Sequence, residues 1–266
     1  MSVLIVIPAR YASTRYPGKP LVELTGATGE AKSLIQRSWD AAMEVKGIDR
    51  VVVATDDSRI ATAAAGFGAE VVMTSPDCQN GTERCAEAFE NLGGGFDIVV
   101  NLQGDAPLTP AWFIEDLVAG LMAHPESDVA TPVLRTDGGM LNDLLQDRRE
   151  GRVGGTTAVF GSNNNALYFS KEVVPFTGQV FGPADATPVY HHVGVYAYRP
   201  SALVAYADWP AGPLEKLEGL EQLRFLERSV PMLCVEVAAK GRQFWELNNP
   251  EDLPRIETML RDMDQP

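Results

Sequence analysis

Short apolar segments alternate with segments of helical periodicity through the first half of the chain, and this alternation restricts the possible folds more than any other feature. The apolar segments are rich in valine and isoleucine, as in strands that are buried on both faces. They are Val3–Ile7, Arg50–Ala54, Glu70–Met73 and Phe96–Leu102. The helix-like segments are Ser33–Val45, Arg59–Phe67, Glu83–Leu92 and Trp112–Met122. This order predicts an α/β fold with a mostly parallel sheet that helices cover on both faces.

The second half of the chain follows a less regular pattern. We expect strands over Asp128–Pro132, Ala166–Ser170, His192–Tyr198 and Met232–Val237, and helices over Leu214–Glu227 and Glu251–Met263. The stretch 136–189 is rich in Gly, Asp and Asn, and we interpret it as an inserted subdomain or a subunit-contact region. Because no Pro-, Gly- or Ser-rich linker separates two folding units, we expect a single domain over residues 1–266 with an insertion at about 137–190.

The composition excludes several classes of protein. The chain has 36 acidic and 22 basic residues, and this net charge of −14 argues against general nucleic-acid binding. Three cysteines cannot all pair and show no metal-ligand spacing, so we expect reduced thiols in a cytoplasmic protein. No apolar segment approaches membrane-spanning length, and no basic residue precedes the first one as in a signal peptide.

A local excess of positive charge follows the first apolar segment. Residues 1–22 hold three bases, Arg10, Arg15 and Lys19, and no acid. In parallel α/β sheets, ligands bind beyond the carboxyl ends of the strands. Fixed cations and backbone N–H groups at that place predict a site for a polyanion such as a triphosphate. The spacing matches neither a P-loop nor a Gly-x-Gly-x-x-Gly loop, and a solvated basic loop is the alternative interpretation.

Two further groups of residues can carry chemistry. Asp105 follows the fourth apolar segment, where a lone Asp is usually a turn residue or helix cap. Beside a triphosphate loop the same carboxylate suits Mg²⁺, which nucleotidyl transfer needs in order to offset phosphate charge. The second group is Gly81-Thr82-Glu83-Arg84 with His192, Glu221 and Gln222. Taken alone, these residues are typical of a helix start, a core histidine and the polar face of a helix.

Six segments in order resemble one family, the 3-deoxy-manno-octulosonate (Kdo) cytidylyltransferases. The first is Pro8–Leu21, which reads Pro-Ala-Arg-Tyr-Ala-Ser-Thr-Arg-Tyr-Pro-Gly-Lys-Pro-Leu and is specific, as is the later Gly81-Thr82-Glu83-Arg84. The others are Ala54–Asp57, Asn80–Arg84, Asn101–Leu108, His192–Arg199 and Leu220–Arg224. The resemblance runs almost end to end and is weakest between about Asp137 and Pro188.

The resemblance implies a fold, a reaction and a set of residue roles. It implies a three-layer α/β nucleotidyltransferase fold with a doubly wound sheet and an inserted dimerisation subdomain, and an enzyme that makes a CMP-sugar and pyrophosphate from CTP and a 2-keto-3-deoxy sugar acid. The implied catalytic residues are Arg10, Lys19 and Asp105. The implied nucleotide-binding residues are Pro8, Ala9, Arg10, Ser13, Arg15, Lys19, Thr55, Asp56, Gly81 and Thr82. The implied sugar-acid ligands are Arg84, Gln103, His192, Tyr196, Glu221 and Gln222.

The metal site departs from the family pattern. The resemblance makes Asp105 a Mg²⁺ ligand, and the family's second metal-binding Asp aligns with Asn248, which offers only a neutral carbonyl. The acid that follows Asp105 in the family is Ala106 here. The alternatives are therefore another sugar acid or a phosphonate as acceptor, or a non-catalytic nucleotide-binding relative. The resemblance also implies a homodimer, and a product used in lipopolysaccharide or another cell-surface polysaccharide.

Overall fold

The computed structural model describes residues 1–12, 16–104, 107–153, 155–242, 245, 247 and 249–263. The chain divides into two compact units. The first unit comprises Met1–Glu115, Tyr198–Ala207 and Ala239–Pro266, and the second comprises Asp116–Ala197 and Asp208–Ala238. The prediction of one domain with an insertion at about 137–190 stays a prediction. None of the described helices is both long and apolar enough to cross a membrane.

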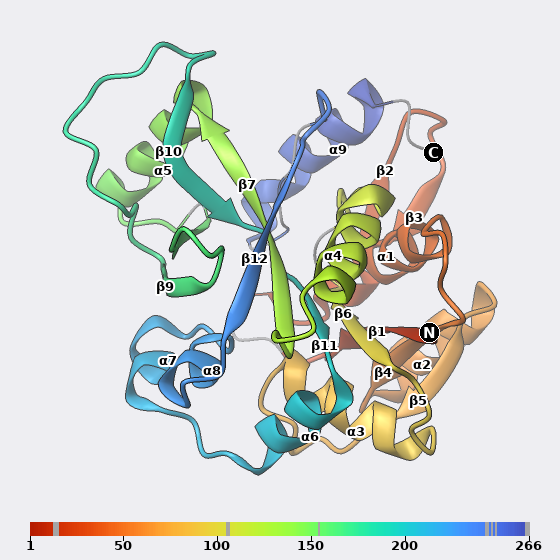
Figure 1. Ribbon diagram of the computed structural model, residues 1–266. Helices are drawn as coiled ribbons and strands as arrows, with labels where there is room; N and C mark the ends of the chain where they lie inside the picture. Colours follow the sequence, from red (N-terminus) through yellow and green to blue (C-terminus); the bar gives the residue numbers. More distant parts are fainter. Residues whose placement is uncertain are drawn as a thin grey trace. The chain divides into compact units, whose positions relative to one another are not determined.

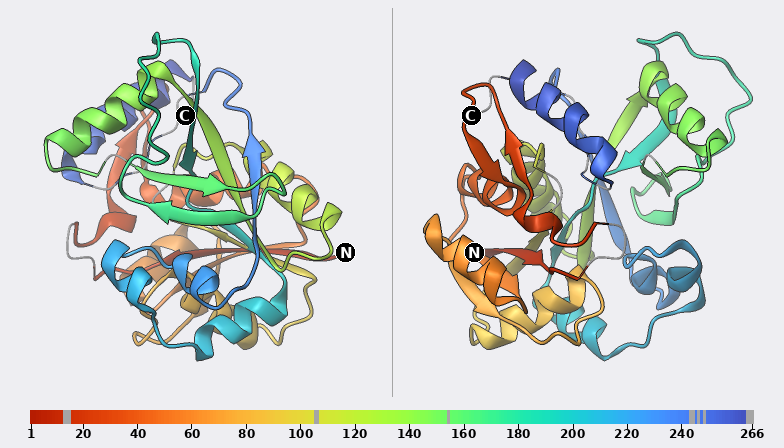
Figure 2. Two further views of the ribbon diagram at one scale, coloured as in Figure 1. Left: turned by 60° about the vertical axis from the view of Figure 1, so that its left-hand side comes forward. Right: turned by 180° about the vertical axis from the view of Figure 1, so that it is seen from behind.

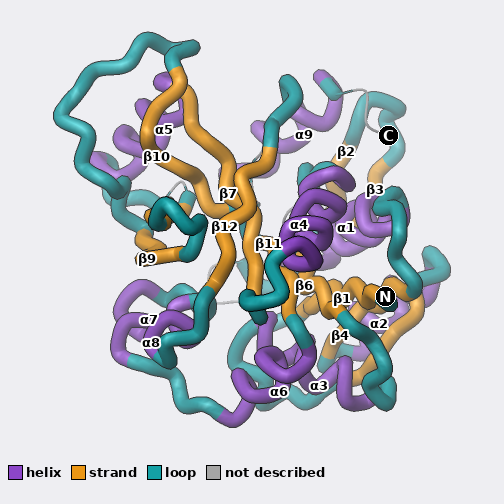
Figure 3. The backbone as a smooth tube through the Cα atoms, in the orientation of Figure 1, coloured by secondary structure: helices purple, strands orange, loops and turns teal. Residues whose placement is uncertain are grey.

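The first unit is built on four parallel strands in the order β5-β4-β1-β6 (Figures 1 and 3). Their bounds are β1 Val3–Ala9, β4 Arg50–Thr55, β5 Glu70–Met73 and β6 Ile98–Leu102. The helices between them are α1 Leu34–Met43, α2 Ser58–Gly66 and α3 Gly81–Asn91. The predicted α/β fold class is confirmed, because valine-rich strands that are buried on both faces alternate with helices as expected.

Each of these three helices starts at a side chain that accepts a hydrogen bond from the first turn. Ser33 accepts from the N–H of Gln36, Asp57 from that of Arg59 and Asn80 from that of Glu83. Such caps satisfy N–H groups that have no partner inside a helix. Asp57 follows β4 and Asn80 follows β5, so these caps fix the residues at which α2 and α3 begin.

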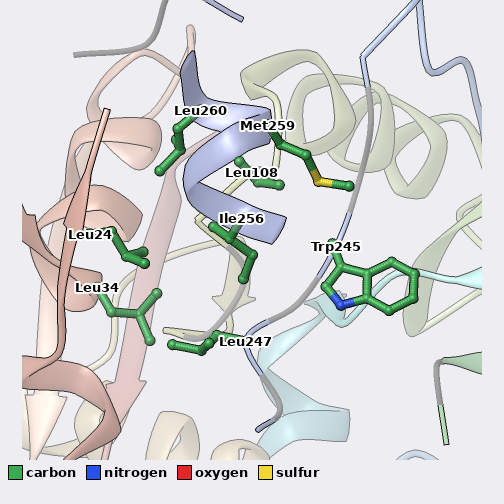
Figure 4. Packing of buried hydrophobic residues seen from close by; sticks show 8 residues of the cluster. All are labelled: Leu24, Leu34, Leu108, Trp245, Leu247, Ile256, Met259 and Leu260. Carbon is green, nitrogen blue, oxygen red and sulfur yellow. The ribbon is translucent and has the colours of Figure 1, made fainter. Parts of the chain in front are cut away.

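The first unit also contains a hairpin and the C-terminal helix, packed around one apolar cluster (Figure 4). The elements are η1 Lys19–Leu21, β2 Glu23–Thr25, β3 Ala31–Ser33, η2 Pro250–Asp252 and α9 Leu253–Asp262. Figure 4 shows Ile256 and Leu260 of α9 on the side of the helix toward Leu24 and Leu34. Glu257 adds a polar contact, since its carboxylate accepts from the N–H of Thr25 at 2.9 Å. The sequence did not predict the hairpin.

The second unit has a mixed sheet around β7. Its strands are β7 Val129–Asp137, β8 Thr156–Phe160, β9 Ala166–Ser170, β10 Ala186–His192 and β12 Met232–Val237. β7 pairs antiparallel with β10 and parallel with β12, and β10 continues through β8 to β9 in antiparallel pairs. Its helices are α5 Gly138–Arg149, α7 Pro213–Glu218 and α8 Leu223–Glu227. In three elements, the boundary between the two units falls within the element itself. They are α4 Ala111–Ala123, β11 Val195–Tyr198 and α6 Pro200–Asp208.

The predicted strand at Ala166–Ser170 is confirmed as β9, and the stretch 136–189 also contains α5, β8 and most of β10. Two other predictions for this region are wrong in detail. The predicted strand His192–Tyr198 is the end of β10 followed by β11, with a break at Val193-Gly194. The predicted helix Leu214–Glu227 is two helices, because α7 ends at Gly219 in a left-handed conformation (φ 64°). Leu217 of α7 is 83% exposed.

Candidate active site

The described residues of the basic loop, 10–12 and 16–19, follow the carboxyl end of β1, as predicted. Arg10 follows the strand and is exposed, and one of its guanidinium N–H groups donates to the carbonyl of Gln79 at 3.3 Å. Lys19 begins η1 and donates from Nζ to the carbonyl of Leu247 at 3.0 Å. The positions predicted for Ser13 and Arg15 lie outside the described residues. The structure therefore places two of the three predicted phosphate-binding cations after β1, each against a neutral backbone oxygen.

The ends of β1 and β6 lie against each other at Gly104. A Cβ atom on Gly104 would lie 3.2 Å from the carbonyl oxygen of Pro8 and 3.3 Å from Cδ1 of Ile35. Only glycine fits this approach without displacing its neighbours. Pro8 and Ala9 are the last residues of β1, and Gln103 is half-buried just after β6. The predicted metal ligands Asp105 and Asn248 lie outside the described residues.

Asp56, a predicted nucleotide ligand, and Arg84, a predicted sugar-acid ligand, form an ion pair with each other. Arg84 on α3 is only 3% exposed, forms an ion pair with Asp56 at 3.1 Å and donates to the hydroxyl of Thr74 at 2.5 Å. Asp56 follows β4, where the buried hydroxyl of Thr55 accepts from the N–H of Asp57 at 3.2 Å. The Arg84–Asp56 pair connects α3 to the end of β4. The sugar-acid role of Arg84 and the nucleotide roles of Thr55 and Asp56 stay predictions.

The start of α3 is anchored by two tyrosines. The hydroxyl of Thr82 lies 2.9 Å from that of Tyr198, and the amide of Asn80 donates to the hydroxyl of Tyr206 at 3.0 Å. Gly81 is the first residue of the helix. Thr82, Tyr198 and Tyr206 are buried, so these contacts fix the direction in which the first N–H groups of α3 point.

A second group of predicted ligands is assembled within the second unit. His192 is 5% exposed, and its Nε2 lies 2.9 Å from the hydroxyl of Thr131. Its ring packs on that of Tyr196, with 5.5 Å between ring centroids, and the hydroxyl of Tyr196 donates to Oε1 of Gln222 at 3.1 Å. The amide nitrogen of Gln222 is buried and has no hydrogen-bond partner among the residues that the structure describes. Glu221, next to it, is half-buried.

The burial of His192 predicts a stability that depends on pH. Burial, with a smaller contribution from neighbouring His191, lowers the pKa of His192 from 6.5 to about 3. Between pH 6.5 and about 3, the unfolded chain binds a proton at His192 and the folded chain does not. The free energy of unfolding therefore falls as the pH falls through this range. We expect a loss of about 1.4 kcal/mol per pH unit from this residue, or roughly 2 kcal/mol between pH 6.5 and 5.

Urea unfolding of wild type and His192→Gln at pH 7, 6 and 5 measures this slope. The glutamine variant has no proton to bind, so the difference in unfolding free energy between the two proteins should shrink toward pH 5. A difference that stays constant across the three pH values would show that His192 does not contribute to the pH dependence.

The link between α7 and α8 is held by contacts that the sequence analysis missed. Arg224 binds Glu215 through two hydrogen bonds of 2.7 Å and also donates to the carbonyl of Trp209 at 3.1 Å. The carboxylate of Glu227 accepts from the N–H groups of Leu214 and Glu215 at the start of α7. Glu221 and Gln222 lie between these contacts along the chain. Arg224 belongs to the segment Leu220–Arg224, which resembles the family, so the sequence pointed to this residue. The sequence did not show that Arg224 is paired with Glu215.

The chain is similar to known cytidylyltransferases over almost its whole length. The cytidylyltransferase family profile matches residues 4–232. The 3-deoxy-manno-octulosonate cytidylyltransferase of Maricaulis maris is 45% identical over 260 residues, which are 98% of this chain and 97% of that protein. The 8-amino-3,8-dideoxy-manno-octulosonate cytidylyltransferase of Shewanella baltica is 40% identical over 98% of this chain and 99% of its own length. A solved CMP:2-keto-3-deoxy-manno-octonic acid synthetase complexed with CTP matches with a TM-score of 0.80, at 31% identity and 98% coverage of both chains.

Proposed function

We propose that this chain, which belongs to the cytidylyltransferase family, transfers CMP from CTP to 3-deoxy-manno-octulosonate and releases pyrophosphate. The observation that carries the proposal is the likeness to the CTP-complexed synthetase over 98% of both chains. The basic loop after β1 supports it independently, because Arg10 and Lys19 place positive charge where a parallel α/β sheet binds its ligand.

The reaction needs positioning and charge neutralisation more than covalent chemistry by the protein. The anomeric hydroxyl oxygen of the sugar acid forms a bond to the α-phosphorus and loses its proton. The bond from that phosphorus to the bridging oxygen of the β-phosphate breaks, and pyrophosphate leaves with the electron pair. Arg10 and Lys19 hold the phosphates and meet the negative charge that develops on the leaving group. Both cations can exchange a neutral carbonyl for phosphate oxygen, which is the stronger acceptor.

We further propose Mg²⁺ as the cofactor, held by Asp105 with the carbonyl oxygen of Asn248. Mg²⁺ prefers oxygen ligands and usually takes one or two carboxylates together with substrate phosphates. Gly104 adjoins Asp105 at the end of β1, and Leu247 adjoins Asn248 at the Lys19 contact. When bound, Mg²⁺ neutralises phosphate charge.

The acceptor has a second candidate. Relatives named 8-amino-3,8-dideoxy-manno-octulosonate cytidylyltransferase are 40–41% identical over 98% of this chain. Pyrophosphate release with CTP and each sugar acid in turn, at matched concentrations, distinguishes the two acceptors. We expect turnover with 3-deoxy-manno-octulosonate and a preference for CTP over UTP. Faster turnover with the 8-amino acid would reassign the substrate, and no release with either acid or a phosphonate would favour a non-catalytic role.

We also propose that the protein works as a cytoplasmic homodimer that supplies lipopolysaccharide synthesis. The long segment between β9 and β10 supports a subunit contact, because it extends away from the strands of the second unit (Figure 2). Large apolar side chains on it are exposed, with Phe176 at 94% and Val180 at 101%. Light scattering during size-exclusion chromatography should give twice the mass of the 28.8 kDa chain. A mass that equals one chain at micromolar concentration would contradict the dimer.

Replacing Lys19 should slow turnover strongly with little effect on stability. Lys19→Met keeps the aliphatic part of the side chain and removes the charge that meets the phosphates. Losing one such cation costs roughly 3 kcal/mol of transition-state stabilisation, on the order of a hundredfold in rate. The measurement is initial-rate pyrophosphate release, with thermal unfolding as the check on folding. Lys46→Met, at an exposed position of the same unit, is the matched control and should keep the wild-type rate.

A further inference from the structure

The ring of Tyr11 is enclosed from two sides within the basic loop. The guanidinium carbon of Arg59 lies 3.3 Å from the centroid of the Tyr11 ring. A Cβ atom on Gly18 would lie 3.1 Å from the same ring, so the glycine backbone packs directly against it. Gly18 has φ +71°, a conformation that other L-residues rarely adopt. Tyr11 therefore joins the start of α2 to the far end of the basic loop.

Arg59 is fixed in this place by Asp57. Its Nε donates to Oδ1 at 3.0 Å and its terminal nitrogen donates to Oδ2 at 2.6 Å. Asp57 also caps α2 by accepting from the backbone N–H of Arg59. The two-point hydrogen bond with Arg59 lowers the pKa of Asp57 to about 2. A bidentate contact of this kind restricts both distance and angle of the guanidinium.

Gly18 contacts the backbone of Tyr11 as well as its ring. The N–H of Gly18 donates to the carbonyl of Tyr11 at 3.0 Å, and that of Lys19 donates to the carbonyl of Tyr16 at 3.3 Å. Arg10 precedes Tyr11 and Lys19 follows Gly18. The contact between Tyr11 and Gly18 therefore sets the separation of the two phosphate-binding cations along the loop.

We propose that Arg59 and Tyr11 are positioning residues that hold Arg10 and Lys19, near the two ends of the basic loop, in the arrangement that binds the triphosphate of CTP. The inference rests on the proposed function, since it assigns CTP to this loop. A loop held in its binding conformation loses less conformational entropy when the ligand binds. An arginine stacked on a tyrosine face contributes an attraction that tolerates exposure of the cation, and the side chain of Arg59 is 57% exposed.

Arg59 could instead touch a phosphate directly, and a double-mutant cycle separates the two roles. The variants are Arg59→Ala, Tyr11→Leu and the pair together, with CTP affinity measured by calorimetry in the absence of a sugar acid. Tyr11→Phe keeps the ring and should behave as wild type. Arg261→Ala removes an arginine of similar exposure that is paired with Glu257 on α9, and is the matched control.

For a positioning role we expect each single substitution to weaken CTP binding about tenfold, and the pair to weaken it about tenfold as well, because both break one contact. Amide hydrogen exchange measured without CTP should become faster across residues 8–21 in all three variants, with thermal midpoints unchanged. Unchanged exchange overturns the proposal, as does a roughly hundredfold loss in the pair, which would make Arg59 a direct ligand. Wild type that binds no CTP would instead refute the proposed function, while the exchange measurement still tests the contact.

Discussion

Asp105→Asn should lose about a thousandfold in Mg²⁺-dependent turnover while the protein stays folded. The substitution keeps the size of the side chain and removes the one carboxylate that the proposed metal site has. A difference of roughly 4 kcal/mol in barrier height corresponds to this factor, and charge neutralisation by a bound metal is worth several kcal/mol. The measurement is pyrophosphate release across a Mg²⁺ titration. Turnover within about threefold of wild type would remove Asp105 from the metal site.

Asn248→Asp tests the second proposed metal ligand, and it adds a negative charge where Asp105→Asn removes one. It restores the carboxylate that the family resemblance leads us to expect and adds one negative charge beside the metal. If Asn248 is a ligand, the variant should reach half-maximal rate at a lower Mg²⁺ concentration. Aspartate and asparagine serve equally well in a turn before a helix, so a purely structural residue would leave the titration unchanged.

The sequence predicted the parallel part of the fold well, for a physical reason. Strands β1, β4 and β6 are buried on both faces, and burial on both faces demands continuous apolar runs that stand out in the sequence. Caps such as Asp57 and Asn80 are local signals, because the side chain and the N–H group that it accepts from are two or three residues apart. Predictions of these elements were accurate to within a few residues.

The second unit was harder to predict because its helices are short or largely polar. α5 is a largely polar helix, capped by Asp137 through the N–H of Met140, and only Leu141 and Leu144 among its large side chains are buried. The break between α7 and α8 occurs at Gly219 (φ 64°), and contacts among Glu215, Arg224 and Glu227 hold the two helices together across it. Sequence periodicity measures neither kind of contact.

For the candidate site too, the sequence predicted some features and not others. The place of Arg10 and Lys19 after β1 follows from the charge pattern and the topology of parallel sheets. That Asp56 and Arg84 form an ion pair could not be predicted, because each residue alone suits a ligand and the pairing depends on how α3 packs. The stack of Tyr11 on Arg59 likewise requires the three-dimensional arrangement of two segments that lie nearly fifty residues apart.

Arg224→Met should destabilise the fold by about 3–5 kcal/mol. The side chains of Arg224 and Glu215 are 3% and 11% exposed and are joined by two hydrogen bonds of 2.7 Å. Removing the arginine leaves a carboxylate buried without its partner, and this desolvated charge costs more than the intact pair contributes. The carbonyl of Trp209 loses a donor at the same time. Urea unfolding followed by circular dichroism gives the change in unfolding free energy.

Two further variants show whether the buried charge causes this loss. Arg224→Met combined with Glu215→Gln removes both charges, and we expect it to recover a large part of the lost stability, because replacing a whole buried pair is often nearly neutral. Arg228→Met removes an exposed arginine at the end of the same helix and should change stability by less than about 0.5 kcal/mol. If the double variant is as unstable as Arg224→Met, the loss arises from packing and the Trp209 contact instead.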